Sequence, residues 1–401
     1  MTGPTVLICA MIATSQLTWG AVVPVLPLFL DRYGMSGALL GTVVTAFGAG
    51  RVLANIPAGL ALRRLPTRAY LRTLMLALAV VTALTGPAHS APTLIGMRLL
   101  AGILGGAAVT VGFAVLVAGA PAGRRGAVMA TATVVQLSAA AAGSVLGGAV
   151  VGVVGPAWTF PIAALPVLAC LLWDTVRPAT PYWSSTPAGP RELAAPARAM
   201  AWPGGRGGLL AALCGLSFAT FFARFAGEQG LVPVLAYDSG GLTPLTLGLA
   251  TAAGTLVSLA AMPVVGRWAD AGARAVLLVP AGLAAGLGLL VLPLLHLPVG
   301  FAAAIVVYSL GTGVVGVLPG VITGEAYPAE AAGAVVGLTR TAGDVGAAAG
   351  PVTVFAVAGL AGNRAACALL ALLVVLAVAA LVATLRRAPR KVEALPVEAV
   401  T

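Results

Sequence analysis

The chain has 401 residues, of which 60% are hydrophobic and only 8% are charged. This composition excludes a water-soluble domain, which needs far more polar surface, and it predicts an integral membrane protein. The net charge of +11 does not indicate a nucleic-acid partner, because most basic residues lie in short segments between apolar stretches.

Twelve apolar stretches follow one another, each long enough to cross a hydrocarbon layer of about 30 Å as a helix. The first six are expected at residues 5–30, 37–62, 70–88, 91–119, 127–154 and 157–175. The second six are expected at residues 208–236, 244–268, 275–295, 298–324, 332–359 and 362–385. The first stretch has no Lys or Arg before Arg32, so it predicts a membrane span rather than a cleavable signal.

These spans divide the chain into four parts. Residues 1–175 predict an N-terminal six-helix bundle, and residues 208–386 predict a C-terminal one. Residues 176–207 are polar and rich in proline, as is typical of a linker, and residues 387–401 predict a polar tail. The expected fold class is all-α, with twelve transmembrane helices arranged as two six-helix bundles.

Basic residues gather in alternate connections between the spans. One set contains Arg63, Arg64, Arg68, Arg72, Arg124, Arg125, Arg267, Arg274, four linker arginines and the tail, whereas the other contains only Arg32 and Arg364. The positive-inside rule therefore predicts that the linker, the tail and both termini are cytoplasmic. Abundant Ala, Gly and Arg with a single Lys are typical of a GC-rich bacterial genome, so we expect the chain to lie in the lipid bilayer of a bacterial inner membrane. We also expect it to be a monomer.

The two halves of the chain are related by a constant offset of 207 residues. This shift superposes Gly34 on Gly241, Gly41 on Gly248, Gly106 on Gly313, Gly143 on Gly350, and Gly155 on Gly362. One offset from the first span to the last pair indicates a duplication, so the two bundles should be pseudo-symmetric. Repeats of this kind are typical of transporters whose halves rock about a site near the bilayer midplane.

Several short motifs stand out along the chain, and two of them, in spans 5 and 11, are repeat partners. Residues 266–274 read Gly-Arg-Trp-Ala-Asp-Ala-Gly-Ala-Arg, and span 4 opens with Arg98 followed by Gly102. Spans 5 and 11 carry glycine stripes that consist of Gly143, Gly147 and Gly148, and of Gly346, Gly350 and Pro351. Together these motifs resemble the major facilitator superfamily over nearly the whole chain, and the span 5 stripe resembles its antiporter motif with Ser144 in place of proline.

The resemblance implies a major facilitator fold, with spans 1, 4, 7 and 10 lining a central cavity and spans 2 and 11 adjacent across the halves. The glycine stripes would then pack against the opposite half and allow it to slide or bend, although ordinary packing of small residues explains them equally well.

Six charged residues are expected inside the bilayer, where each is costly and seldom kept without a use. They are Arg51, Arg98, Arg224, Glu228, Arg340 and Asp344. Arg224 with Glu228, and Arg340 with Asp344, are spaced i, i+4 and so share a helical face; they could simply neutralise each other. We expect instead that Glu228 or Asp344 carries a proton, with Arg51 competing for Asp344, because burial favours a neutral carboxyl group and a nearby arginine favours a charged one.

A second hypothesis concerns a gate at the cytoplasmic ends. Asp270, in the loop that begins at Gly266 and ends at Arg274, is expected to face the start of span 5. At the pseudo-equivalent place the signs are reversed, so Arg63 and Arg64 are expected to face Glu325 and Glu330. The alternative is that these are solvated loop charges that contribute little.

The expected cavity lining has few polar groups, which suits a lipophilic and cationic small-molecule substrate better than a sugar. These residues are Gln16, Thr18, Trp19, Thr110, Ser217, Thr220, Gln229, Tyr308 and Thr312. We expect proton-coupled export of a drug-like or natural-product molecule, with uptake of a small metabolite as the main alternative and a membrane sensor or enzyme as a weaker one. No phosphate-binding loop, metal cluster or catalytic constellation is visible, so we expect no enzyme activity and no cofactor or metal, with the proton as coupling ion.

Overall fold

A computed structural model describes residues 3–29, 34, 36–62, 64–120, 125–184, 207–270, 272, 274–327 and 329–387. Within these ranges the chain is almost entirely helical and contains no strand. The side chains of residues 125, 126, 270 and 329–334 lie outside what is described.

Besides the 3-10 turn η1 (Pro156–Trp158), the described part of the first bundle contains six long α-helices and one short one. They are α1 (Gly3–Val22), α3 (Gly37–Ala61), α4 (Thr67–Thr85), α5 (Ala91–Gly119), α6 (Arg125–Val154), α7 (Thr159–Val176) and α8 (Thr180–Trp183). The prediction that the first span runs unbroken to residue 30 is wrong, because α1 ends at Val22 and residues 23–27 form turns. Pro24 and Pro27 lack the N–H groups that a continuing helix would need.

The second bundle contains the remaining helices. They are α10 (Gly207–Ala223), the π-helix η3 (Arg224–Leu231), α11 (Val232–Asp238), α12 (Pro244–Asp270), α13 (Arg274–Val291) with the 3-10 turn η4 (Leu292–Leu294), α14 (Pro298–Ala326) and α15 (Ala329–Arg387). Helices α10, η3 and α11 form one continuous span, and α15 breaks at Gly362 (φ 84°) into two. Eleven segments among the described residues are long and apolar enough to cross a membrane, and the last is this double one. The predicted fold class of twelve transmembrane helices is therefore confirmed.

The repeat is visible in the backbone itself. Gly34 (φ 57°) and Gly241 (φ 65°) both adopt the left-handed conformation, and so do Gly155 (φ 91°) and Gly362 (φ 84°). Each pair is separated by the offset of 207 residues. These are turns between spans in which a side chain would be strained, which explains why both copies retain glycine.

The contacts between the bundles follow the same symmetry. A Cβ atom at Gly41 of α3 would lie 2.9 Å from the carbonyl oxygen of Pro351 in α15, and one at Gly248 of α12 would lie 2.3 Å from that of Ser144 in α6. The offset relates Gly41 to Gly248 and Ser144 to Pro351. The bundles are therefore joined by two equivalent helix pairs, α3 with α15 and α6 with α12.

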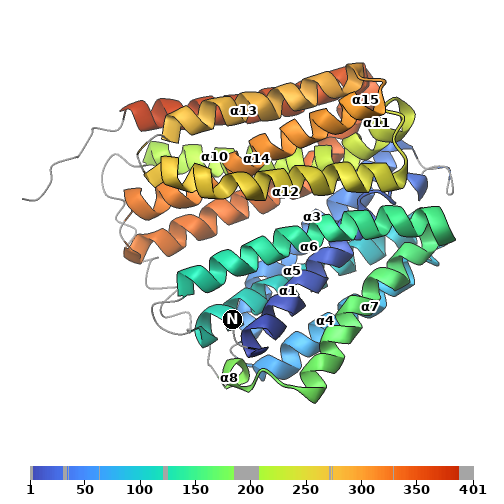
Figure 1. Ribbon diagram of the computed structural model, residues 1–401, viewed down its shortest axis with the longest axis vertical. Helices are drawn as coiled ribbons and strands as arrows, with labels where there is room; N and C mark the ends of the chain where they lie inside the picture. Colours follow the sequence, from blue (N-terminus) through green and yellow to red (C-terminus); the bar gives the residue numbers. More distant parts are fainter. Residues whose placement is uncertain are drawn as a thin grey trace, which may run out of the picture.

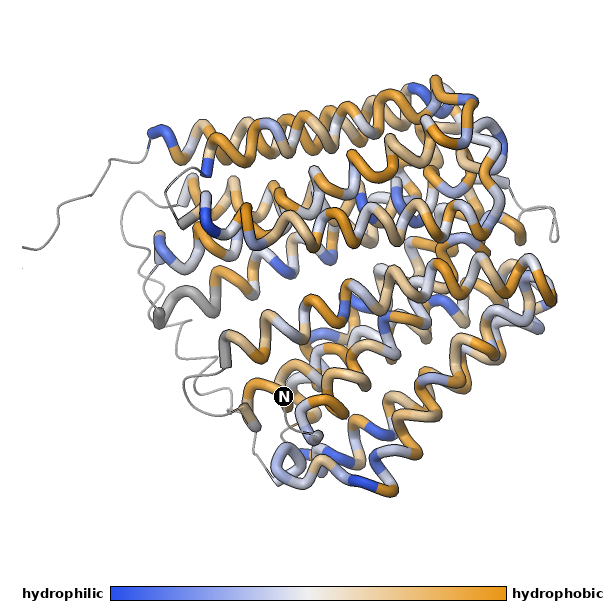
Figure 2. The backbone as a smooth tube through the Cα atoms, viewed as in Figure 1, coloured by the Kyte–Doolittle hydropathy of each residue, from blue (hydrophilic) through white to orange (hydrophobic). Residues whose placement is uncertain are grey.

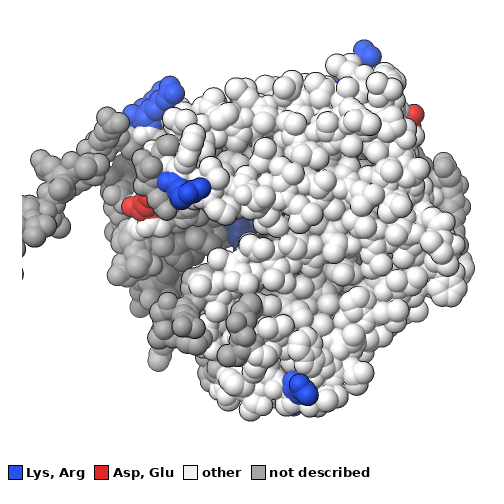
Figure 3. Space-filling view, in the orientation of Figure 1, with Lys and Arg blue, Asp and Glu red and all other residues white. Residues whose placement is uncertain are grey.

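We call the end of the molecule where α1 begins and α15 finishes the linker end. The bundles diverge there, and they converge at the opposite end, where these contacts lie (Figure 1). Near the linker end, Ile56 of α3 and Val336 of α15 are 71% and 50% exposed. The space-filling view shows a hollow between the bundles on this side, with Lys or Arg atoms deep inside it (Figure 3). We call this hollow the cleft.

The glycine stripes pack mainly within their own bundles. A Cβ atom would lie 2.3 Å from the carbonyl oxygen of Leu17 if placed at Gly143, and 2.1 Å from that of Ala21 if placed at Gly147. At Gly346 and Gly350 it would meet Phe218 and Phe222 of α10. Of the residues in the two stripes, only Gly148 and Pro351 face the other bundle. A Cβ atom at Gly148 would lie 2.2 Å from the carbonyl oxygen of Pro244. The expectation that both stripes pack against the opposite half is therefore correct only for these two.

Hydrophobic residues cover most of the helices, and hydrophilic ones lie at the helix ends and at a few points midway along them (Figure 2). The exposed apolar side chains, such as Leu172, Leu283 and Leu360, face outward where lipid tails would surround a membrane protein. The hydrophilic points midway along the helices mark the candidate site.

Candidate functional site

Asp344 of α15 lies at the inner edge of the contact between the bundles. Its side chain is 2% exposed, and Arg51 Nη2 of α3 lies 3.5 Å from its Oδ1 atom. Asn55 Nδ2, one turn further along α3, donates a 2.5 Å hydrogen bond to Oδ2, and Thr110 of α5 donates to Asn55 Oδ1 at 3.3 Å. The other oxygen, Oδ1, accepts no hydrogen bond from the described residues. The carboxylate thus joins the two bundles through partners on one helix, and it is only partly satisfied.

Arg340 does not pair with Asp344, although the two are spaced i, i+4. No ion pair between them is found in the described chain, and Arg340 is exposed. Arg51 takes Asp344 instead, as the predicted competition requires, because α3 packs against the face of α15 that carries the aspartate. Arg340 points into the cavity described below.

Glu228 lies in the π-helix η3, which interrupts the seventh span. Arg224 Nε lies 3.5 Å from Glu228 Oε2, so this predicted i, i+4 pair is formed. The Glu228 side chain is 20% exposed. π-helical turns are rare and frequently occur at functional sites.

Three of the four intramembrane arginines lie over aromatic rings. Arg98 lies 4.4 Å from the centroid of Phe47, Arg224 lies 5.4 Å from that of Trp19, and Arg51 lies 5.7 Å from that of Phe225. Phe225 in turn contacts Trp19 and Phe47, with centroid distances of 6.0 and 6.4 Å. This aromatic cluster of Trp19, Phe47 and Phe225 joins α1 and α3 of the first bundle to η3 of the second.

A narrow cavity extends from this region into the first bundle. The empty space between its walls is about 550 Å³, which includes a part that is open to solvent. Very little of that space is wide enough for a water molecule. Its polar and charged lining consists of Ser15, Gln16, Thr18, Trp19, Arg51, Thr82, Thr85, Arg98 and Arg340. Three of the predicted cavity residues, Gln16, Thr18 and Trp19, are therefore in its wall.

The other predicted cavity residues lie elsewhere. Thr110 belongs to the Asp344 network, whereas Gln229 and Tyr308 are buried in the second bundle, and their Nε2 and hydroxyl groups have no partner among the described residues. Thr220 and Thr312 donate to carbonyl oxygens of their own helices, and Ser217 packs beside Gly343. The intramembrane charges consist of four arginines and only two carboxylates. This excess of positive charge does not favour the cationic substrate expected from the sequence.

The predicted gate residues are described only in part. Arg63 lies outside the described residues, as do the side chains of Asp270 and Glu330. Glu325 pairs with Arg274 of its own bundle, and Arg64 is exposed with no ion pair in the described chain. Gly266 has open space around it. The predicted contact of Arg63 and Arg64 with Glu325 and Glu330 would require the linker ends to come together.

Two polar residues were missed by sequence reasoning. Asn55 lies one helical turn after Arg51, and this spacing predicts that both side chains lie on one face of α3 and can reach the same partner. Asp174 lies at the end of the span expected at residues 157–175, with no role predicted for it, yet it is fully buried and central to a polar network.

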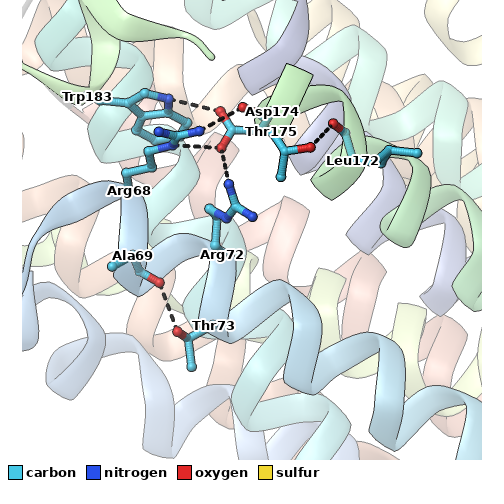
Figure 4. A network of polar contacts seen from close by, with 8 residues as sticks. All are labelled: Arg68, Ala69, Arg72, Thr73, Leu172, Asp174, Thr175 and Trp183. Atoms are coloured by element: carbon cyan, nitrogen blue, oxygen red, sulfur yellow. Dashed lines mark hydrogen bonds and ion pairs between the residues drawn. The ribbon is translucent and has the colours of Figure 1, made fainter. Parts of the chain in front are cut away.

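The Asp174 network fastens the start of the linker to the first bundle (Figure 4). Arg68 Nε and Arg72 Nη1 of α4 lie 2.9 and 3.1 Å from Asp174 Oδ2, and Trp183 Nε1 of α8 donates to Oδ1 at 3.0 Å. Arg68 also donates to the Asp174 carbonyl oxygen at 2.7 Å. Both carboxylate oxygens are therefore satisfied by partners from the same half of the chain.

Comparisons with known proteins agree with this architecture. The chain matches the family model described as Major Facilitator Superfamily over residues 8–351 and again over 218–400. Among solved structures, the human organic anion transporter MFSD10 (TETRAN) is similar with a TM-score of 0.66 and 19% identity, over 95% of this chain and 100% of that one. A POT family transporter in complex with a thioalcohol-conjugated peptide is similar with a TM-score of 0.76 and 12% identity, over 96% of each chain.

These structural likenesses, at such low identity, show the fold alone, and a search of the curated proteins found no match. The match to the family model, in contrast, covers most of the sequence. Its members are transporters rather than enzymes, so the chain is a multi-pass membrane protein that moves small molecules. The chain belongs to the major facilitator superfamily.

Proposed function

We propose that this transporter couples the export of a lipophilic, drug-like or natural-product molecule to proton movement, and that Asp344 is the principal proton carrier. The observation that carries the proposal is the position of Asp344, which is 2% exposed and joins the two bundles through Arg51 and Asn55 of α3. A buried charge in that position is costly and is seldom kept without a use.

The coupling follows from the partners of Asp344. When it is charged, it attracts Arg51 and accepts from Asn55, and so holds α3 against α15. When the substrate-loaded bundles separate at the opposite end, Asp344 loses Arg51 and takes up a proton from that side. When the bundles close again at that end, Arg51 returns to Asp344 and the proton leaves through the cleft at the linker end, so that one proton moves inward for each substrate moved outward.

Glu228 is the second candidate carrier. Its partner Arg224 lies on the same π-helix, so protonation of Glu228 removes no ion pair between the bundles directly. It does free Arg224, which lies over Trp19 of the first bundle. We therefore assign Glu228 a supporting role and Asp344 the main one.

The orientation also supports export. We propose that the linker end faces the cytoplasm of a bacterium, since arginines are concentrated in the connections at that end. The cleft opens there, so a cytoplasmic substrate could enter directly. Lipophilic substrates suit the aromatic cluster of Trp19, Phe47 and Phe225, which lies between the two bundles.

The test is the drug susceptibility of an efflux-deficient bacterial host that expresses the chain, measured with and without a protonophore. The panel should include carboxylates, amines and neutral compounds. We expect reduced susceptibility to at least one compound, and loss of this protection with the protonophore. Unchanged susceptibility across the panel, or protection that survives the protonophore, would contradict proton-coupled export.

A further inference from the structure

A groove lies between α13 and the last part of α15, close to the linker end. These two helices lie side by side at the outer edge of the second bundle (Figure 1). The groove has a volume of about 460 Å³ and is open on one side. It shares no lining residue with the narrow cavity of the first bundle. Its lining consists of Val279 of α13 and of Ala379, Val382, Ala383, Arg386 and Arg387 of α15.

The groove opens where the close packing of the two helices ends. Nearer the opposite end, a Cβ atom would lie 2.8 Å from Val375 Cγ2 if placed at Gly286, and 2.9 Å from Val378 Cγ2 if placed at Gly282. Val279, one turn nearer the linker end, is 39% exposed instead. The walls of the groove therefore come from both helices, on the outer side of the bundle.

The apolar part of the groove continues as a surface that faces lipid. Exposed leucines extend the helical faces of Val279 and Ala379 at intervals of three or four residues. They are Leu283, Leu287, Leu372 and Leu376. Ala383 follows the first of the α15 leucines by eleven residues, which corresponds to roughly 16 Å of helix. That length is about half of a hydrocarbon layer of about 30 Å, so the apolar surface matches an acyl chain of one leaflet.

Two arginines stand at the end of this surface. Arg386 and Arg387 lie in the last turn of α15, and both are exposed. Neither forms an ion pair with any carboxylate whose side chain is described. Basic residues at the end of a helix interact favourably with its dipole, but that interaction does not depend on a groove beside them.

The pseudo-equivalent place in the first bundle differs in one respect. The offset of 207 residues relates Val279 to Arg72 and Leu381 to Asp174. Between α4 and α7, Arg72 therefore has a carboxylate partner within its own bundle, at 3.1 Å. In the second bundle a buried leucine takes the place of that aspartate, so the arginines beside the groove have no such internal anion.

We propose that this groove binds an anionic phospholipid of the leaflet at the linker end. The guanidinium groups of Arg386 and Arg387 bind the phosphate, and one acyl chain lies along Val279, Val382 and Ala383. Basic residues at the membrane surface attract anionic headgroups, and the guanidinium fork matches the geometry of a phosphate. A second copy of the chain, docked symmetrically, would instead bring two like-charged pairs of arginines together. Lipid binding requires neither a transported substrate nor a proton, so the proposal does not depend on the proposed function.

The test is thermal unfolding of the purified full-length chain in micelles of a neutral detergent. Phosphatidylglycerol is the probe, phosphatidylcholine supplies acyl chains without net charge, and inorganic phosphate supplies the anion without acyl chains. One variant combines Arg386→Gln with Arg387→Gln. A second, Ala383→Phe, fills the apolar part of the groove from an exposed position. The matched control combines Arg177→Gln with Arg267→Gln, which removes two exposed arginines at the linker end.

We expect phosphatidylglycerol to raise the unfolding midpoint of the wild-type protein in a saturable manner, with little effect from the other two compounds. Loss of Arg386 and Arg387 should weaken the apparent affinity for phosphatidylglycerol about tenfold or more, because each arginine contributes to the attraction. Ala383→Phe should weaken it several-fold, and the control variant should keep the wild-type affinity. Without anionic lipid, all variants should unfold close to the wild-type midpoint, since none of them loses an ion pair between described side chains.

Equal stabilisation by phosphatidylcholine or by inorganic phosphate would overturn the inference, because the groove would then not recognise both parts of the lipid. Unchanged affinity in the arginine variant or in Ala383→Phe would also overturn it, as would an equal loss in the control variant. Light scattering on the same samples detects the alternative occupant. A wild-type dimer that Ala383→Phe converts to a monomer would assign the groove to a second copy of the chain and contradict the lipid site.

Discussion

Asp174 and Asp344 both lie beside arginines, and they differ in how completely their oxygen atoms are bonded. Asp174 accepts from Arg68, Arg72 and Trp183 at 2.9 to 3.1 Å, and both of its carboxylate oxygens are used. Asp344 accepts one hydrogen bond, from Asn55, while Arg51 remains 3.5 Å away. The two aspartates have almost the same burial, with side-chain exposures of 0% and 2%.

The location of the partners explains this difference. All partners of Asp174 come from the first half of the chain, so they keep their positions if that bundle moves as a rigid body. The partners of Asp344 come from the opposite bundle, so the contact must form and break as the bundles rock. A fully bonded carboxylate suits a permanent fastening, whereas a partly bonded one can exchange its partner for a proton.

The largest expected effect is on transport by Asp344→Asn. This substitution keeps the size of the side chain and removes its charge, so it should abolish coupling. We expect protonophore-sensitive protection to fall about tenfold or more, an amount typical of a lost charge-assisted contact. The measurement is the susceptibility assay described above, on the compound with the largest shift. Full protection by Asp344→Asn at normal expression would show that Asp344 does not carry the proton.

An intermediate effect is expected where the two bundles touch. In Gly248→Ala the new Cβ atom would lie 2.3 Å from the Ser144 carbonyl oxygen, so the bundles could not approach as closely. We expect a several-fold loss of protection in the same assay. Gly152→Ala of α6 is the matched control, because nothing lies within 4 Å of that position. Equal activity of the two variants would mean that close contact between α6 and α12 is not needed for transport.

The smallest effect on transport is expected from Asp174→Asn. This change weakens two ion pairs and leaves the surrounding hydrogen bonds partly unmade, which should cost about 2 kcal/mol of stability. The variant should unfold at a lower temperature in nanodiscs, yet protect the host as well as wild type when corrected for the amount of folded protein. A selective loss of proton coupling in Asp174→Asn would remove the distinction between the two aspartates.

Much of the fold could be predicted because the signals are local. Apolar length determines the spans, and glycines at a fixed offset indicate the repeat; their positive φ angles supply the physical reason at Gly34, Gly155, Gly241 and Gly362. The end of α1 at Val22 was missed because the apolar pattern continues through Pro24 and Pro27. The π-helix at Glu228 has no signal in composition or spacing.

The candidate site was harder to predict, since its contacts come from different helices. The i, i+4 spacing correctly paired Arg224 with Glu228. It failed to pair Arg340 with Asp344, because Arg51 of another helix forms the ion pair with Asp344 instead. The buried position of Asp174 depends on α4 and α8 packing around it, which the sequence near residue 174 does not indicate. That Arg98 lacks a carboxylate partner in the described chain is likewise known only from the packed structure.

The central claim, that the proton on Asp344 controls the approach of the two bundles, can be tested without knowing the substrate. Spin labels at Leu60 of α3 and Val336 of α15, both exposed near the linker end, would report the distance across the cleft by pulsed electron paramagnetic resonance. In the wild-type protein we predict a shift from longer to shorter distances as the pH falls from about 8 to about 5, because a proton on Asp344 removes the charge that attracts Arg51. Asp344→Asn should show the short distance at both pH values, and Asp174→Asn should keep the wild-type shift. An unchanged pH-dependent shift in Asp344→Asn would contradict the account.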